Sequence, residues 1–124
     1  MIRTQKIDDV ILFEIEGEIR RPEIAETSLL HLIRTELDAG KRKFLVNLER
    51  LEFMDSYGIR DLLESYILAR NAGTEFKMAC IPVKFLAATF SAGGCPPQDF
   101  LYKSVKAALA SFSPAKPDTK PGRK

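Results

Sequence analysis

The residues best placed for chemistry in this sequence are Asp55 and Ser56, which join two segments of different pattern. The apolar run 44–46 predicts a strand and the amphipathic segment 59–71 predicts a helix, so the pair falls at a strand-to-helix turn. One interpretation is that Asp55 or Ser56 caps the helix, because the N–H groups of a first helical turn have no partner within the helix. The other is that an exposed Ser56 hydroxyl accepts a phosphate, because these N–H groups and the helix dipole favour negative charge.

Catalysis by Ser56 itself is not predicted. A serine nucleophile needs a base within hydrogen-bond reach, and the only histidine, His31, is predicted in the middle of another helix. The two cysteines, Cys80 and Cys95, have neither metal-binding nor redox spacing, and we expect both to be reduced thiols. We therefore expect no enzymatic activity, no metal and no cofactor.

The composition is typical of a soluble single domain. The 124 residues are 45% hydrophobic and 29% charged, which is ordinary for a globular protein. A net charge of +2 gives no argument for binding to nucleic acid. No apolar run reaches transmembrane length and no signal peptide is recognisable, so we expect a cytoplasmic protein without direct membrane insertion.

The order of the predicted elements indicates an α/β fold. Alternating strands and helices predict a mixed, mostly parallel sheet of about four to five strands with about four helices. The predicted strands cover residues 2–6, 10–16, 43–47, 75–79 and 100–102, and the predicted helices cover 23–39, 59–71, 82–90 and 105–112. Gly17 is expected to end the second strand. Residues 1–112 are predicted to form one domain, and the basic, proline-containing residues 113–124 a disordered tail.

The stretch 47–59 resembles the signature of STAS-domain proteins, the anti-sigma factor antagonists of bacteria. Its last five residues, Asp55-Ser56-Tyr57-Gly58-Ile59, stand where that family has Asp-Ser-Ser/Thr-Gly-Leu opening a helix. The resemblance extends over residues 7–112 and implies a single STAS-like domain. In that family the first Ser after the Asp is phosphorylated, and this position is Ser56 here.

The resemblance implies a switch that acts through protein binding. The unmodified surface around Ser56 would dock against an anti-sigma factor that is also a serine kinase, and docking would release a sigma factor. Phosphorylation of Ser56 would abolish docking, and a serine phosphatase would reset the switch. The residues expected to bind the partner are Glu18, Arg20, Arg21, Asp55, Ser56, Tyr57 and Gly58.

Two departures from the family pattern affect the expected site. Tyr57 stands where the family usually has Ser or Thr, which bears on recognition by the kinase. In the earlier loop, Arg20 and Arg21 follow Gly17-Glu18-Ile19, where the family commonly has Gly-Glu-Leu-Asp. These arginines belong to a solvated loop, or they contact a phosphate on Ser56 or select an acidic partner.

Two other functions are compatible with the same pattern. STAS-like domains also resemble accessory subunits of lipid transporters and scaffold proteins of stress-sensing assemblies, in which the surface would be a permanent docking site. A nucleotide-binding module is the third possibility, with Arg20, Arg21 and the Ser56 turn holding phosphates.

Overall fold

The computed structural model describes residues 2–19, 28–82 and 101–112. Its elements in chain order are β1 (Ile2–Ile7), β2 (Val10–Ile19), α1 (Leu29–Asp38), β3 (Lys43–Met54), α2 (Ser56–Asn71), β4 (Glu75–Ala79), β5 (Leu101–Tyr102) and α4 (Val105–Ser111). The helix predicted over 82–90 lies outside the described residues apart from its first position. The predicted tail 113–124 also lies outside them.

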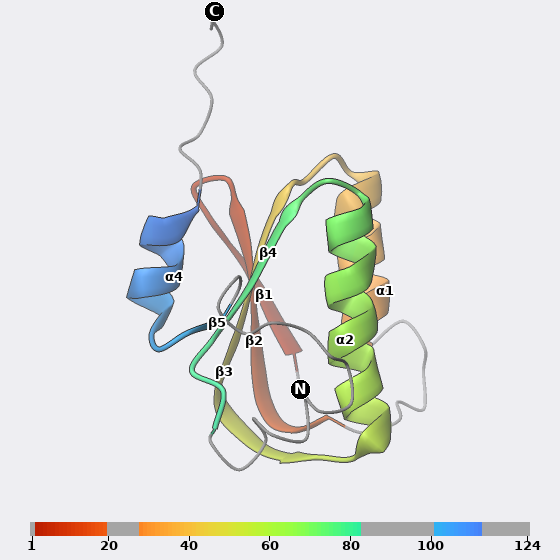
Figure 1. Cartoon of the computed structure of the whole chain (residues 1–124), viewed down its shortest axis with the longest axis vertical. Coiled ribbons are helices and arrows are strands. Elements are labelled where there is room, and N and C mark those ends of the chain that lie inside the picture. The colour runs from red at the N-terminus through yellow and green to blue at the C-terminus, as the bar shows by residue number, and fades with distance from the viewer. Residues whose placement is uncertain (1, 20–27, 83–100, 113–124) are drawn as a thin grey trace, which may run out of the picture.

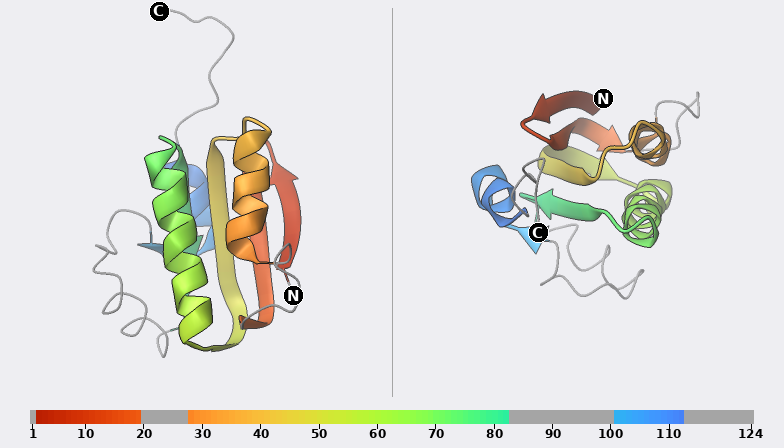
Figure 2. Two further views of the ribbon diagram at one scale, coloured as in Figure 1. Left: turned by 90° about the vertical axis from the view of Figure 1, so that its right-hand side faces the viewer. Right: turned by 90° about the horizontal axis from the view of Figure 1, so that it is seen from above.

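The five strands form one mixed sheet in the order β1-β2-β3-β4-β5. β1 pairs with β2 antiparallel, and the other three pairings are parallel. Helices α1 and α2 lie side by side on one face of this sheet, while α4 covers the opposite face near β4 and β5 (Figures 1 and 2). The predicted α/β class and the mostly parallel sheet are therefore confirmed.

Alternation along β2 supplies both hydrophobic layers. Ile11, Phe13 and Ile15 are buried on the face that carries α1 and α2, as their spacing predicts. Val10 and Leu12 are buried on the other face, in the cluster that includes residues of α4. Within the described part of the chain, no helix is both long enough and apolar enough to cross a membrane.

β3 is longer than its sequence pattern indicates, running to Met54 rather than stopping at Asn47. Beyond Asn47 only every third residue is buried, namely Leu48, Leu51 and Met54. The pairing with β2 explains this spacing, because its register shifts twice and β3 advances one extra residue at each shift. A strand with such bulges loses its period of two, which is why its second half was not predicted.

The end of β2 also corrects a prediction. Gly17 does not end the strand, which continues to Ile19. Gly17 lies at the second register shift with a φ of 85°, a left-handed conformation that glycine adopts at little cost. The glycine therefore allows β2 to follow the bulged end of β3.

Helix α1 begins later than predicted. Ser28 is extended and its Oγ accepts the N–H of His31, so the helix that ends at Asp38 starts at Leu29 rather than Glu23. The predicted start failed because residues 23–28 have apolar and polar types compatible with a helix, while the actual start depends on a partner in α2.

That partner is Asp61, a buried carboxylate of α2. Its two oxygens accept the N–H groups of Leu29 and Leu30, each over 3.0 Å. Together with Ser28, Asp61 therefore satisfies the first three N–H groups of α1, which have no partner within their own helix. These two bonds to Asp61 join residues more than 30 positions apart and hold α1 against α2.

Replacing Asp61 is expected to destabilise the domain. Asp61→Ala leaves two N–H groups unsatisfied in a buried place, so the free energy of unfolding should fall by about 2–4 kcal/mol. Urea unfolding followed by circular dichroism measures this change. Asp38→Ala, at the exposed end of α1, serves as the control and should change the value by less than about 0.5 kcal/mol. Equal effects of the two substitutions would contradict the role given to Asp61.

The stability contributed by Asp61 is also expected to depend on pH. Burial raises the pKa of the Asp61 carboxyl above its ordinary value of 3.8, although its two N–H donors act in the opposite direction. Folding then favours the protonated form, so this contribution is full below pH 3.8 and is lost as the pH rises through the raised pKa. The difference in unfolding free energy between the wild type and Asp61→Asn should therefore decrease as the pH rises. A difference that stays constant between about pH 3 and pH 7 would refute the raised pKa.

Candidate functional site

The turn from β3 to α2 is closed by Asp55. Asp55 is extended, with φ −88° and ψ −176°, and its Oδ1 accepts the N–H of Gly58 over 2.9 Å. Its backbone carbonyl accepts the N–H of Ile59 over 3.0 Å, which is the first bond of the helical ladder. Asp55 is thus the N-cap of α2, and the choice between Asp55 and Ser56 that the sequence left open falls on Asp55.

Ser56 is the first residue of α2, and its side chain is exposed. Its hydroxyl makes no hydrogen bond to any other described residue, so the local fold does not use it. The helix also starts three residues earlier than the predicted Ile59, because the cap lies at Asp55. An exposed hydroxyl on the first turn of a helix is accessible to a modifying enzyme, and a phosphate is electrostatically favoured there.

Two neighbours of Ser56 in the sequence have different surroundings. Tyr57 is 39% exposed, so it belongs to the surface around Ser56. Gly58 is buried and donates its N–H to the Asp55 cap. This bond gives Gly58 a structural role in the first turn of α2, beside its expected place at the partner-binding surface.

The carboxyl end of β2 lies beside the carboxyl end of β3, next to this turn. The parallel register places Glu18 opposite Phe53 and Ile19 opposite Met54, immediately before Asp55. Glu18 is exposed, and its position beside the end of β3 agrees with the expected parallel pairing. Arg20 and Arg21 lie outside the described residues, and their expected contacts stay predictions.

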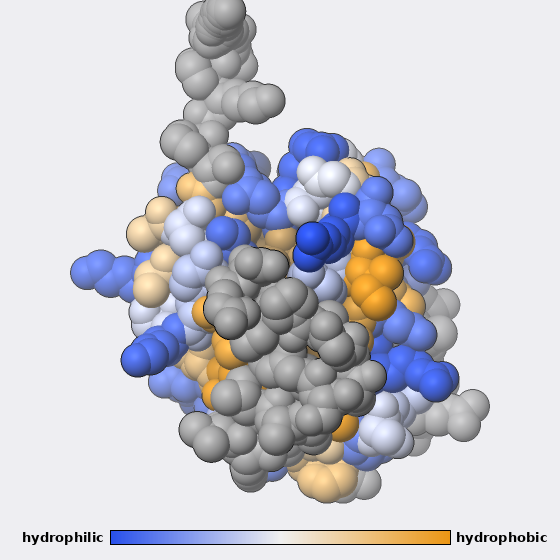
Figure 3. Space-filling model, viewed as in Figure 1, coloured by the Kyte–Doolittle hydropathy of each residue, from blue (hydrophilic) through white to orange (hydrophobic). Residues whose placement is uncertain are grey.

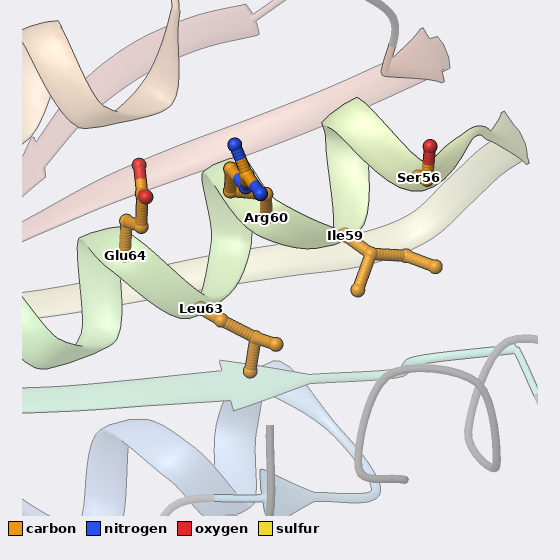
Figure 4. A pocket seen from close by; sticks show the side chains of 5 residues that line it. All are labelled: Ser56, Ile59, Arg60, Leu63 and Glu64. Atoms are coloured by element: carbon orange, nitrogen blue, oxygen red, sulfur yellow. The ribbon is translucent and has the colours of Figure 1, made fainter. Parts of the chain in front are cut away.

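Two open hollows adjoin Ser56 along α2, and Arg60 lines both of them. The larger, of about 290 Å³, is lined by Ser56, Ile59, Arg60, Leu63 and Glu64. The smaller, of about 230 Å³, is lined by Ser56, Tyr57 and Arg60. Figure 4 shows the Ser56, Arg60 and Glu64 side chains along one side of α2, with Ile59 and Leu63 pointing to the other.

Sequence reasoning assigned no role to Arg60 or Glu64. The spacing contains the missing signal, because residues four apart are neighbours on a helix and Ser56, Arg60 and Glu64 form such a row. A search for charged residues at this spacing from Ser56 would have found both.

Apolar side chains are also exposed close to the polar row. Phe53, just before the turn, is 41% exposed, and Ile67 on α2 is 49% exposed. Figure 3 shows hydrophobic atoms at the surface over α2, among polar ones. A surface that mixes exposed apolar and charged side chains suits contact with another protein.

The donor groups needed for metal chemistry do not gather here. Among the described residues, no three His, Cys, Asp or Glu side chains are grouped so that they could hold a metal ion. What the site offers is an exposed hydroxyl, an arginine and a mixed surface, which can be modified and can bind a protein.

Comparison with known proteins identifies the family. The profile of the STAS domain family matches residues 1–108. This chain belongs to the STAS domain family. No curated protein matches this STAS domain at a significant level of sequence similarity.

Solved structures share the fold of this STAS domain. An anti-sigma factor antagonist from Mycobacterium paratuberculosis superposes with a TM-score of 0.69 at 20% identity, over 90% of this chain and 92% of that one. The anti-sigma factor antagonist SpoIIAA in its unphosphorylated form gives a TM-score of 0.62 at 15% identity, over 89% and 94%. A chain from the molecular architecture of the stressosome, a signal integration and transduction hub, gives 0.66 at 19% identity, over 87% and 93%. At these identities the likeness concerns the fold.

The different roles of Asp55 and Ser56 in this STAS domain lead to a prediction about stability. Asp55→Ala removes the cap of α2 and should lower the free energy of unfolding by about 1 kcal/mol. Ser56→Ala removes an exposed hydroxyl that bonds no described residue, and should change it by less than about 0.5 kcal/mol. Urea unfolding of the two variants beside the wild type measures both values. A larger loss for Ser56→Ala than for Asp55→Ala would show that Ser56 is the cap.

Proposed function

We propose that this STAS domain is an anti-sigma factor antagonist that is switched off by phosphorylation of Ser56. Its partner would be an anti-sigma factor with serine kinase activity, and binding would release a sigma factor. A serine phosphatase would restore the unmodified protein. The domain itself would be a binding protein, without catalytic activity.

The observation that carries this proposal is the free, exposed Ser56 hydroxyl beside a cap made by another residue. Because Asp55 caps α2, a phosphate on Ser56 need not remove any bond that the fold depends on. The modification could therefore change the surface and leave the fold intact. The STAS family and the likeness to two anti-sigma factor antagonists support the proposed role.

The electrostatics make such a modification an effective switch. A phosphoserine adds about −1.5 to −2 charges at neutral pH. Enclosing that charge without a partner in a protein contact costs about 2–5 kcal/mol, which lowers affinity by about 30-fold to several thousand-fold. The exposed apolar side chains of Phe53 and Tyr57 would supply contact area in the unmodified state.

We expect phosphoserine at position 56 to weaken partner binding strongly. The full chain with serine or phosphoserine at position 56 would first be used to capture partners, which mass spectrometry would identify. Calorimetry with the captured anti-sigma factor should then show an affinity at least about 30-fold lower for the phosphorylated protein. Ser56→Ala should bind like the wild type.

A control for the position of the added charge is phosphoserine at position 111, although the Ser111 hydroxyl, unlike that of Ser56, donates to the carbonyl of Ala108. Ser111 is an exposed residue of α4, on the opposite face of the sheet from α2, so a phosphate there should leave the affinity unchanged. Equal binding by the Ser56 and phosphoSer56 proteins would refute the switch.

A permanent docking role is the second candidate, and the likeness to a chain of the stressosome favours it. The same surface would then bind its partner in an assembly without being modified. The gel mobility of the cellular protein in a phosphate-binding matrix separates the two proposals. A single unshifted band under every growth condition would favour permanent docking. A docking role in a lipid transporter and a nucleotide-binding role remain predictions, the latter testable by thermal shift with GTP or ATP.

A further inference from the structure

We propose that Arg60 is the internal counter-ion of phosphorylated Ser56, so that modification both adds a phosphate and withdraws an arginine from the binding surface. The inference rests on the proposed phosphorylation of Ser56 and assigns a role to a residue outside the STAS signature motif. It follows from the position of Arg60, from its lack of a partner among the described residues and from the charges around it.

The position of Arg60 allows a direct contact. Arg60 is four residues after Ser56, so the two side chains leave α2 on the same side, as Figure 4 shows. Residues at this spacing have Cβ atoms about 5–6 Å apart, which the long arginine side chain can span. Both hollows beside α2 are lined by this pair, so open space surrounds the place where a phosphate would lie.

Arg60 is also available. Its side chain is exposed and makes no hydrogen bond or ion pair with any described residue. Arg70 and Arg42 are engaged by contrast, since Arg70 donates to the Tyr66 hydroxyl and Arg42 to the carbonyl of Gly73. Pairing with a phosphate would therefore break no existing contact of Arg60.

The acidic side chains on either side of Ser56 favour a nearby cation once a phosphate is present. Asp55 precedes Ser56, and Glu64 lies two helical turns after it on the same side of α2. Arg60 is the only basic residue among positions 55–64. Along positions 55–64, a dianion at Ser56 would thus have Asp55 before it, Glu64 beyond it and Arg60 as the one basic side chain.

Glu64 is the natural competitor of the phosphate. It lies four residues beyond Arg60, the same spacing that separates Arg60 from Ser56. No ion pair within 4.0 Å joins Arg60 to Glu64 in the described part of the chain. A phosphate carries more charge than a carboxylate and offers the guanidinium two oxygens at once, so the Ser56 side would prevail after modification.

The pair of Arg60 and the phosphate would increase the effect of phosphorylation on partner binding. In the unmodified protein the guanidinium of Arg60 is exposed beside Ser56 and can donate hydrogen bonds to an acidic group of a partner. After modification, the same guanidinium would be occupied by the phosphate of its own chain. The partner would then lose an attractive contact and meet a negative charge in its place.

The test uses the full chain with phosphoserine placed at position 56 during synthesis, and follows its phosphate by 31P NMR over a pH titration. A nearby cation favours the dianion, so the second pKa of the phosphate should lie about 0.3 pH units lower in the wild type than in Arg60→Gln. Arg60→Lys, which keeps the charge without the two-pronged geometry, should fall between them.

Arg34→Gln is the matched control, because Arg34 is exposed on α1 and the substitution removes the same charge. Its phosphate should titrate like that of the wild type. The difference between wild type and Arg60→Gln should shrink in about 1 M salt, where the Debye length is about 3 Å. Urea unfolding of unmodified Arg60→Gln verifies that the variant folds.

Equal phosphate pKa values in the wild type and Arg60→Gln would overturn the inference, as would an equal change in Arg34→Gln. This outcome differs from failure of the proposed function. Because the phosphoserine is installed by synthesis, the titration does not depend on a kinase or a partner. A partner that binds Ser56 and phosphoSer56 proteins equally would refute the switch, whatever the titration shows.

Discussion

The hydrogen bond between the Asp55 carboxylate and the N–H of Gly58 is the interaction on which the site depends. It ends β3, starts α2 and uses the carboxylate rather than the neighbouring hydroxyl as the cap. Ser56 is therefore held in a defined helical position while its side chain stays free. A residue that can be modified without loss of a structural bond can carry a signal at little cost in stability.

The sheet determines what lies beside this turn. At each of the two register shifts β3 has one more residue than β2, and the end of β3 then lies beside Glu18. Without these bulges the alternating pattern would continue, and Leu51 and Met54 could not both face the core at a spacing of three. The irregular end of β3 thus joins a buried layer to an exposed turn, and the exposed Phe53 is part of the same irregularity.

Helix α2 contributes to the structure and to the surface at the same time. Its inner side carries Asp61, which binds the start of α1, and Leu62 in the core. Its outer side carries Ser56, Arg60 and Glu64 in a row one helical turn apart. Because the inner contacts hold the helix in place, a change of charge on the outer side would alter the surface and leave the packing intact. This division suits a protein whose signal is read by another protein.

The sequence by itself determined the local features of this protein. The strand-turn-helix order, the two-sided alternation of β2 and the polar turn at Asp55 and Ser56 follow from residues a few positions apart, because periodicity and capping are local effects. The left-handed Gly73 after α2 belongs to the same class, since a glycine just beyond a helix indicates its end. The STAS signature and the α/β class could be predicted for this reason.

Only the tertiary structure decided the rest. Whether Asp55 or Ser56 caps the helix depends on side-chain geometry that both residue types allow. The length of β3 depends on bulges in its pairing with β2, and the start of α1 depends on Asp61, more than 30 residues away. The spacing of Ser56 and Arg60 is visible in the sequence, but only the structure shows the open hollow that both residues line. The length of β3 and the start of α1 arise from contacts between distant segments, which burial and register create and which no local pattern in the chain specifies.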